Sequence, residues 1–320
     1  MYHVVALGEL VIDFSPGGVS DRGNALYERQ PGGAPSNVLA AVSRLGGNAA
    51  LMGMVGDDSF GYYLQEMALS CGIDCAGLCF TKEAYTTLAF VHLDGSGERS
   101  FTVMRKPGAD TQLRREQVRT DMISDTRILH VSAAALTDDP CREAVFYAAM
   151  CAKKENKLIS FDANYREALW GREEAVKVMR SFLPYVDILK VSEEEMTMLT
   201  DVNDIPQGAK KLSEQGISLV TVTCGSEGSY YSYAGGVGFV PTYTVQTIDT
   251  NGAGDAFLGT LLYQISCLQD GGIKDIPQKN MERMLRAASA AGALCAARPG
   301  ALLNGPTREE INELAKDIIL

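Results

Sequence analysis

A turn of small residues bounded by two aspartates is the clearest site for chemistry in this sequence. It reads Asp249-Thr-Asn-Gly-Ala-Gly-Asp255, and the following residues, Ala-Phe-Leu-Gly-Thr-Leu-Leu262, have a helical pattern. Gly252, Ala253 and Gly254 leave the backbone N–H groups at the helix start open to an anion. Asp255 adds a carboxylate that can accept a proton. Both features suit phosphoryl transfer to a hydroxyl, although a simple helix cap would have the same pattern.

A second glycine-rich segment lies near the start of the chain. It reads Gly32-Gly-Ala-Pro-Ser-Asn37 and leads into a helical pattern over 36–45. Gly32 and Gly33 permit close approach of the backbone to a ligand, and Asn37 can hydrogen-bond a hydroxyl. Asp13 ends an apolar strand pattern, where it either forms a turn or accepts hydrogen bonds from neighbouring sugar hydroxyls. The simpler alternative for the glycine-rich segment is a loop that begins a helix.

Two common nucleotide-binding motifs are absent from the sequence. No Gly-x-x-x-x-Gly-Lys-Ser/Thr segment occurs, which excludes a P-loop enzyme. Phe257 stands where a dinucleotide fingerprint after Gly252 and Gly254 would need its last glycine.

The composition indicates a globular protein that acts on small molecules. The 320 residues are 46% hydrophobic and 22% charged, and the formal net charge is −11. Because nucleic acids and anionic membranes attract basic surfaces, neither is an expected partner. The first residues have no basic run before their apolar stretch and no cleavage-site pattern, so a signal peptide is not expected. The uncharged runs are too short to cross a bilayer. We therefore expect a cytoplasmic protein.

The order of the apolar runs predicts the fold class. Short apolar runs alternate with helical patterns, which favours an α/β fold with a mostly parallel, doubly wound sheet in three layers. Loops at the carboxyl ends of such strands usually bind the ligand. The expected strands of this sheet cover 4–10, 50–55, 128–132, 158–163, 187–191 and 219–223, with early helices over 36–45 and 60–69.

Two strand-like segments interrupt this alternation. One covers about 11–34 and the other about 84–106, where a hairpin is expected to turn at 94–97. We expect one domain over 1–320, with these segments forming a small inserted β-sheet that serves as a lid or a dimer contact.

Taken together, the two glycine-rich segments resemble the paired signatures of the ribokinase-like (pfkB) sugar kinases. The resemblance extends over essentially the whole chain, because further segments match in the same order. These segments are Asp13, Phe161-Asp-Ala-Asn-Tyr-Arg166, Ser192-Glu-Glu-Glu195, Thr223-Cys-Gly-Ser-Glu-Gly228 and an Ala-rich helix from Ala287 to Ala297. Each motif alone is modest, but their joint order is specific.

The resemblance implies a role for each candidate residue. Asp255 would be the catalytic base, beside an anion hole for the γ-phosphate at Gly252, Ala253 and Gly254. The sugar would be bound by Asp13, Gly32, Gly33, Asn37, Phe101, Arg105, Asn164 and Arg166. ATP would be bound by Ser192, Thr223, Gly225, Ser226, Gly228 and Ser289. Glu195 would position Mg²⁺ through water, and the backbone carbonyl of Asp249 would bind K⁺, as in members activated by a monovalent cation. The small sheet would cover the sugar and form a homodimer.

Within the family, the first signature and the segment ending at Arg166 look most like those of bacterial fructokinases. Fructose is therefore the expected substrate, with fructose 6-phosphate as the product. A 2-keto-3-deoxygluconate kinase is the main alternative, because those enzymes place an arginine near the position of Arg105 to bind a carboxylate. Another small-sugar kinase, or a sugar-binding protein without catalysis, also remains open. Ser192 and Ser289 depart from the asparagines that are frequent at their positions.

Overall fold

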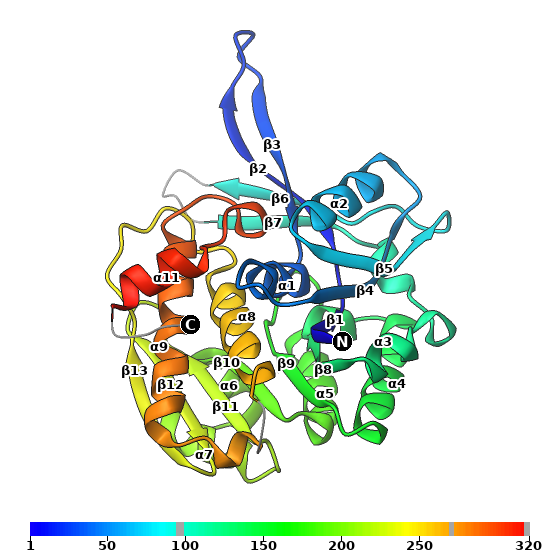
Figure 1. Ribbon diagram of the computed structural model, residues 1–320. Helices are drawn as coiled ribbons and strands as arrows, with labels where there is room; N and C mark the ends of the chain where they lie inside the picture. The colour runs from blue at the N-terminus through cyan, green and yellow to red at the C-terminus, as the bar shows by residue number, and fades with distance from the viewer. Residues whose placement is uncertain (94–98, 269–271, 317–320) are drawn as a thin grey trace.

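The computed structural model describes residues 1–93, 99–268 and 272–316. Its centre is a nine-stranded sheet with the strand order β13-β12-β11-β10-β9-β8-β1-β4-β5 (Figure 1). The strands are β1 (Tyr2–Leu7), β4 (Ala49–Gly56), β5 (Ile73–Thr81), β8 (Thr126–Ser132), β9 (Leu158–Asp162), β10 (Ile188–Ser192), β11 (Leu219–Thr223), β12 (Gly228–Tyr233) and β13 (Gly236–Pro241). All pairings from β5 to β11 are parallel, whereas β12 and β13 add an antiparallel edge. The expected mostly parallel α/β sheet is confirmed.

Helices cover both faces of this sheet because successive strand residues point to opposite sides. In β1, Val5 and Leu7 belong to one apolar core, whereas Val4 and Ala6 belong to another. The first core packs against α3 (Thr120–Ser124), α4 (Cys141–Lys154), α5 (Arg172–Phe182), α6 (Glu193–Thr200) and α7 (Ile205–Ser213). The second packs against α1 (Ala34–Arg44), α2 (Ser59–Ser70), α8 (Ala253–Ser266), α9 (Gln278–Ala296) and α10 (Ala301–Asn304). The last helix, α11 (Arg308–Ala315), packs on α9.

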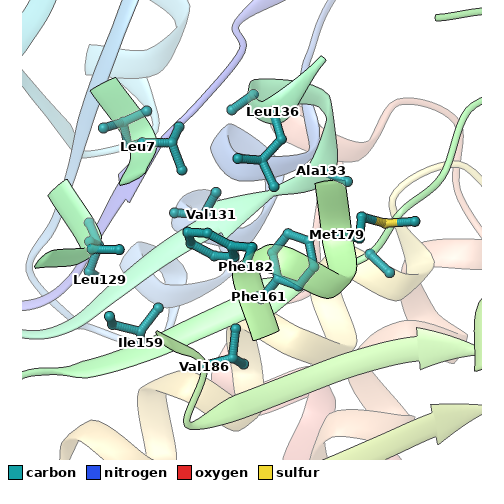
Figure 2. Packing of buried hydrophobic residues seen from close by; sticks show 14 of the residues in the cluster. Leu7, Leu129, Val131, Ala133, Leu136, Ile159, Phe161, Met179, Phe182 and Val186 are labelled. Atoms are coloured by element: carbon teal, nitrogen blue, oxygen red, sulfur yellow. The ribbon is translucent and has the colours of Figure 1, made fainter. Parts of the chain in front are cut away.

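Aromatic rings fill the centre of the first core. Phe161 of β9 and Phe182 of α5 meet edge to face, with their ring centroids 5.2 Å apart (Figure 2). Both side chains are fully buried, and burial of each contributes about 1.5–3 kcal/mol to folding. This packing holds β9 in the middle of the sheet, so the position of its carboxyl end is well determined.

A second sheet of four strands extends away from the body (Figure 1). It consists of β2 (Val11–Val19), β3 (Ala25–Gly32), β6 (Leu88–Leu93) and β7 (Arg99–Met104), in the order β3-β2-β6-β7. The inserted sheet expected from the sequence is therefore present, although the expected turn at 94–97 lies outside the described residues. Phe14 stacks on Phe90 at 4.9 Å, and Tyr27 meets Phe90 edge-on at 5.8 Å. These rings form an apolar layer on this small sheet.

The strands β5, β12 and β13 were not predicted from the sequence. β5 contains Gly77 and an irregular register with β4, while glycines interrupt the apolar alternation of β13. No helix within the described ranges 1–93, 99–268 and 272–316 is both long and apolar enough to cross a membrane.

Close packing of α8 on α1 leads to a stability prediction. A Cβ atom at Gly259 would lie 2.5 Å from the Val38 carbonyl oxygen and 2.7 Å from the Ala41 Cβ. Gly259→Val should therefore lower the free energy of unfolding by about 1–3 kcal/mol, as measured by urea denaturation. Gly171→Val is the matched control, because among the described residues no atom beyond its chain neighbours lies within 4 Å of an added Cβ. Equal stability of both variants and the wild type would contradict this packing argument.

Candidate functional site

The candidate residues gather where the parallel strands end. Asp162 ends β9, Ser192 ends β10 and Thr223 ends β11. The first turn of α8, with Asp255, lies against the same edge, since a Cβ at Gly254 would be 3.2 Å from Lys190 Nζ of β10. This is the edge at which ligands bind in parallel α/β sheets.

A hydrogen bond joins the two glycine-rich segments. Asn37 lies in the first turn of α1, and its Nδ2 donates to Oδ2 of Asp255 over 2.8 Å. Both side chains are buried. Asn37 Oδ1 is also buried and has no hydrogen-bond partner within the described residues. Because an unpaired buried oxygen is costly, this atom is well suited to accept a hydrogen bond from a ligand hydroxyl.

Burial and charge give Asp255 the properties of a base. The pKa of Asp255 is raised to about 6, mainly by desolvation and also by the neighbouring Asp162 carboxylate. The Asn37 hydrogen bond and the charges of Lys190 and Arg166 oppose this increase. A carboxylate with a pKa near 6 is ionised at neutral pH, yet it takes up a proton more readily than an ordinary aspartate.

Close contacts leave no room for a side chain at Gly32 and Gly33. A Cβ at Gly32 would lie 2.2 Å from Oδ2 of Asp13, so only glycine lets the Asp13 carboxylate approach the loop. Gly33 has a φ of 117°, and a Cβ there would be 2.4 Å from the Glu9 carbonyl oxygen. The pKa of Asp13 is raised to about 6, mainly by desolvation, and the positive charge of Arg166 opposes this increase. Asp13, Gly32, Gly33 and Asn37 thus form one polar wall.

The predicted anion hole is formed in part by unpaired backbone groups. Gly252 adopts a φ of 76° directly before α8, a conformation that favours glycine. The N–H of Ala253 donates to the Thr250 carbonyl over 3.3 Å. For the N–H groups of Gly252 and Gly254, the part of the chain that the structure describes offers no hydrogen-bond acceptor. These two N–H groups lie at the positive end of the α8 dipole, so they are better donors to a phosphate than the N–H of Ala253.

A cavity of about 410 Å³ opens beside the anion hole. Its lining includes the predicted nucleotide-site residues Thr223, Gly225, Ser226, Gly228 and Ser289. Ala253, Gly254 and Phe257 of α8 also line it, so the cavity reaches the start of that helix. Ser192 does not line it, because its hydroxyl caps α6 by accepting a hydrogen bond from the Glu195 N–H.

Glu195 holds two loops together. One carboxylate oxygen accepts a hydrogen bond from the Ser192 N–H over 2.8 Å, and the other accepts from the Tyr165 N–H over 2.7 Å. The loop it binds contains Asn164, whose φ of 28° lies in the left-handed region that asparagine tolerates. Within the described ranges, no three His, Cys, Asp or Glu residues form a direct metal-binding group.

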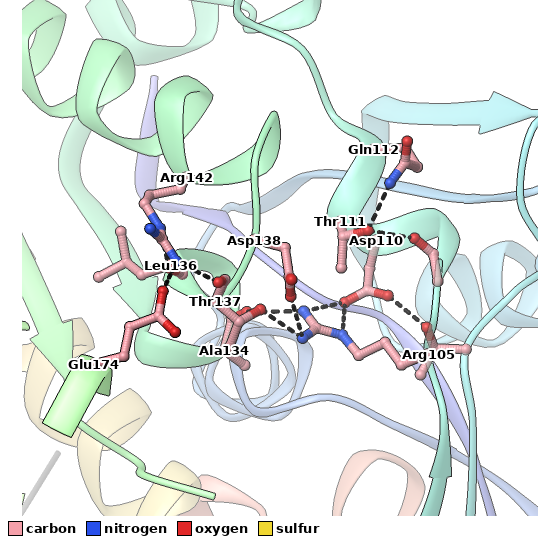
Figure 3. A network of polar contacts seen from close by, with 12 residues as sticks. Arg105, Asp110, Thr111, Gln112, Ala134, Leu136, Thr137, Asp138, Arg142 and Glu174 are labelled. Atoms are coloured by element: carbon pink, nitrogen blue, oxygen red, sulfur yellow. Dashed lines mark hydrogen bonds and ion pairs between the residues drawn. The ribbon is translucent and has the colours of Figure 1, made fainter. Parts of the chain in front are cut away.

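The two candidate arginines have different surroundings. Arg166 is exposed, and its charge lowers the pKa of both Asp13 and Asp255. Arg105 is buried in a polar network (Figure 3). Its guanidinium donates to Asp110, to the Thr137 hydroxyl and to the Ala134 carbonyl, at distances of 2.6–2.8 Å. The protein therefore occupies all three nitrogens of Arg105, whereas Arg166 remains accessible to a ligand.

Two other predicted residues are Asp249 and Phe101. Asp249 lies near this cluster, since its charge contributes to the raised pKa of Asp13. Asp249 accepts a hydrogen bond from the Asn251 N–H over 2.8 Å, and its own N–H donates to the Ala296 carbonyl. The strand β7 contains Phe101, but the side chain of Phe101 lies outside the described part of the chain.

Sequence reasoning missed three buried charged groups at this edge. Lys190 Nζ donates to both Asp162 oxygens, over 2.8 and 2.9 Å. Glu9 accepts hydrogen bonds from the Ala34 N–H and the Ser132 hydroxyl. A lysine inside the apolar run Ile188-Leu-Lys-Val191 was the available signal, because buried charges rarely occur without a partner.

Comparison with known proteins shows the family of the chain. The model of the pfkB family carbohydrate kinases matches residues 1–308. The chain therefore belongs to this family of carbohydrate kinases.

Individual relatives resemble the chain over nearly its whole length. Fructokinase-1 of Oryza sativa subsp. japonica is 41% identical over 319 residues, which cover 97% of each chain. The crystal structure of a Xylella fastidiosa fructokinase with bound ATP superposes with a TM-score of 0.92 at 32% identity, covering 99% of both chains. A double-mutant fructokinase of Vibrio cholerae O395, with fructose, ADP and potassium ion bound, has a TM-score of 0.87 at 34% identity, covering 98% of both chains.

The electrostatics of Asp255 predict the pH dependence of activity. Since only the carboxylate acts as a base, kcat should fall as the pH drops through about 6, the pKa of Asp255. Asn37→Ala removes a hydrogen bond that lowers this pKa, so the midpoint of its kcat profile should move to higher pH. Initial rates at saturating substrate between pH 5 and 8 measure both midpoints, with circular dichroism confirming that each protein stays folded. A lower midpoint in the variant would contradict this account.

Proposed function

We propose that this carbohydrate kinase transfers the γ-phosphoryl group of ATP to D-fructose and forms fructose 6-phosphate. The observation that carries this proposal is the hydrogen bond between Asn37 and Asp255. It holds the base against the wall formed by Asp13, Gly32 and Gly33, at the end of a cavity that suits a nucleotide. The full-length similarity to fructokinases supports fructose as the acceptor.

The proposed reaction uses one base and one anion site. Asp13, Asn37 and Arg166 hydrogen-bond the sugar hydroxyls, with Asn164 beside them. As the sugar oxygen attacks the γ-phosphorus, its proton passes to the Asp255 carboxylate, and the bond to the leaving ADP breaks. The N–H groups of Gly252 and Gly254 stabilise the charge on the phosphoryl oxygens, with a smaller contribution from Ala253.

ATP is expected in the cavity lined by Thr223, Gly225, Ser226, Gly228 and Ser289. Mg²⁺, when bound, neutralises part of the phosphate charge, and we assign Glu195 to hold it through water. The Asp249 backbone carbonyl is the proposed ligand of K⁺, an ion that is bound in the related double-mutant fructokinase of Vibrio cholerae O395.

The 2-keto-3-deoxygluconate alternative loses its main support. It depended on Arg105 to bind a substrate carboxylate, but the guanidinium of Arg105 is satisfied by Asp110, Thr137 and Ala134. Removing a buried arginine from such a network costs more than a new contact usually gains. Arg166 is the remaining accessible cation of the two candidates, so an acidic sugar would have to bind there.

We also propose a cytoplasmic homodimer that pairs through the small sheet. Its aromatic layer and the exposed apolar residues Leu26, Tyr27 and Val19 support this arrangement, since thin sheets rarely leave such residues uncovered. The cytoplasm supplies the ATP that the reaction consumes. The single-domain organisation over 1–320 remains a prediction.

The catalytic proposal is tested by ATP consumption with Mg²⁺ and K⁺ across fructose, ribose, tagatose, adenosine and 2-keto-3-deoxygluconate. Fructose should give the largest kcat/KM. Asp255→Asn should lower kcat by about 10²–10⁴-fold, because it removes the general base. Asp121→Asn is the matched control, since Asp121 is exposed and pairs with Arg119 on the surface. A higher kcat/KM for another sugar would reject fructose, and an active Asp255→Asn enzyme would reject the proposed base.

The dimer proposal is tested by light scattering during size-exclusion chromatography. Leu26 is 46% exposed on β3, and Leu26→Asp should shift the protein from dimer to monomer because the interface would bury a charge. Leu69→Asp is the control, because Leu69 is 54% exposed on α2 and lies outside the small sheet. A monomeric wild type, or a Leu26→Asp dimer as stable as the wild-type dimer, would refute pairing through this sheet.

A further inference from the structure

A buried lysine lies beneath the proposed anion hole. Lys190 occupies the middle of β10, where its neighbours Leu189 and Val191 are apolar, and it is only 7% exposed. Its ammonium forms two hydrogen bonds with the Asp162 carboxylate. Burying an ammonium is costly even when it is paired, and an apolar side chain at this position would usually be as stable. This cost indicates that Lys190 has a role beyond stability.

The position of the ammonium explains why residue 254 is glycine. A Cβ at Gly254 would lie 3.1 Å from Lys190 Cε and 3.2 Å from Lys190 Nζ. These distances are tighter than ordinary van der Waals contact. The absence of a side chain at residue 254 therefore lets the ammonium approach the first turn of α8, where the N–H groups of Gly252 and Gly254 have no acceptor among the described residues.

None of the described residues that line the nucleotide cavity carries a positive side chain. The eighteen lining residues are all glycine, alanine, serine, threonine, valine, tyrosine or phenylalanine. A triphosphate carries several negative charges, so a fixed cation near the cavity would add to the stabilisation that Mg²⁺ and the backbone N–H groups give. Gly254 is one of the lining residues, so Lys190 lies directly behind the cavity wall.

The charges around Lys190 keep it positive. Desolvation opposes the ammonium form, but Asp162, Glu195 and Asp255 together raise the pKa of Lys190 above its usual value. The negative charges of these three carboxylates thus favour the charged form of Lys190. Its charge in turn lowers the pKa of Asp255.

We propose that Lys190 is a positioning residue for phosphoryl transfer. Its ammonium supplies fixed positive charge beneath the anion hole, which stabilises the γ-phosphoryl group on one side and the Asp255 carboxylate on the other. Asp162 holds Lys190 in this position. The inference builds on the proposed kinase function, but its effect on nucleotide binding is independent of which sugar is phosphorylated.

The first test compares Lys190→Met with the wild type. Loss of the cation should lower kcat by about 10²–10³-fold, as expected when one stabilising group is removed from a developing anion. It should also weaken ATP binding more than ADP binding, by roughly tenfold, because only ATP carries the γ-phosphate. Calorimetry without sugar measures this ratio. If the variant kept the wild-type ratio of ATP affinity to ADP affinity, the proposal would be wrong. Because no sugar is present, this result does not depend on which sugar is the substrate.

The dependence of kcat on pH provides a second test. If Lys190 had only a structural role, its loss would not raise the pH at which kcat is half-maximal. Other groups facing Asp255 are Asp162 on β9, Arg166 in the following loop, Asn37 on α1 and Cys295 on α9. With these unchanged, Lys190→Met should raise the kcat midpoint on the acidic side, and Asp162→Asn should lower it. Shifts opposite to these, or unchanged midpoints, would contradict the electrostatic role.

A double variant separates catalysis from folding. Lys190→Met leaves Asp162 buried without its partner, so it is expected to lower the melting temperature. In Lys190→Met/Asp162→Asn the pair is replaced by neutral groups, and the melting temperature should return towards that of the wild type. We expect kcat and the ATP-to-ADP affinity ratio to remain low, since the ammonium is still missing. If kcat and the affinity ratio recovered together with the melting temperature, the only role of Lys190 would be to neutralise the Asp162 carboxylate, and the proposal would be wrong.

Discussion

The structure depends most on one buried hydrogen bond, which joins Asn37 to Asp255 across 218 positions of sequence. It links the start of α1 to the start of α8, and therefore the candidate sugar wall to the candidate anion hole. The two helices can approach closely enough because Gly259 of α8 lies against the Val38 carbonyl of α1. The geometry of the base is thus a consequence of helix packing in the second apolar core.

Burial of charge is the second organising feature of the site. Asp255, Asp162, Glu195 and Lys190 lie together at the carboxyl edge of the sheet, where little water is available to solvate them. Low solvation raises the affinity of Asp255 for a proton, and it also strengthens every interaction between charges there. The apolar packing around Phe161 and Phe182 keeps this edge rigid, so such strong interactions act at fixed distances.

Much of the fold could be predicted from the sequence because the parallel strands are buried on both faces. Their apolar runs, such as those of β8, β9 and β11, are short and continuous, and helical patterns separate most of them. The antiparallel edge strands β12 and β13 were not predicted. In β13, glycines and exposed residues weaken the alternation of apolar and polar residues that indicates a strand. The irregular register of β5 with β4 had no visible signal in the sequence.

The sequence by itself determined the family, the two glycine-rich segments and the candidate base, because these depend on residue types at short spacing. Only the tertiary structure decided which charged groups are available to a ligand. Arg105 is occupied by Asp110, Thr137 and Ala134, whereas Lys190 was overlooked in an apolar strand and lies beneath the anion hole. The physical reason is that the charge, solvation and reach of a side chain depend on partners that folding brings from distant parts of the chain.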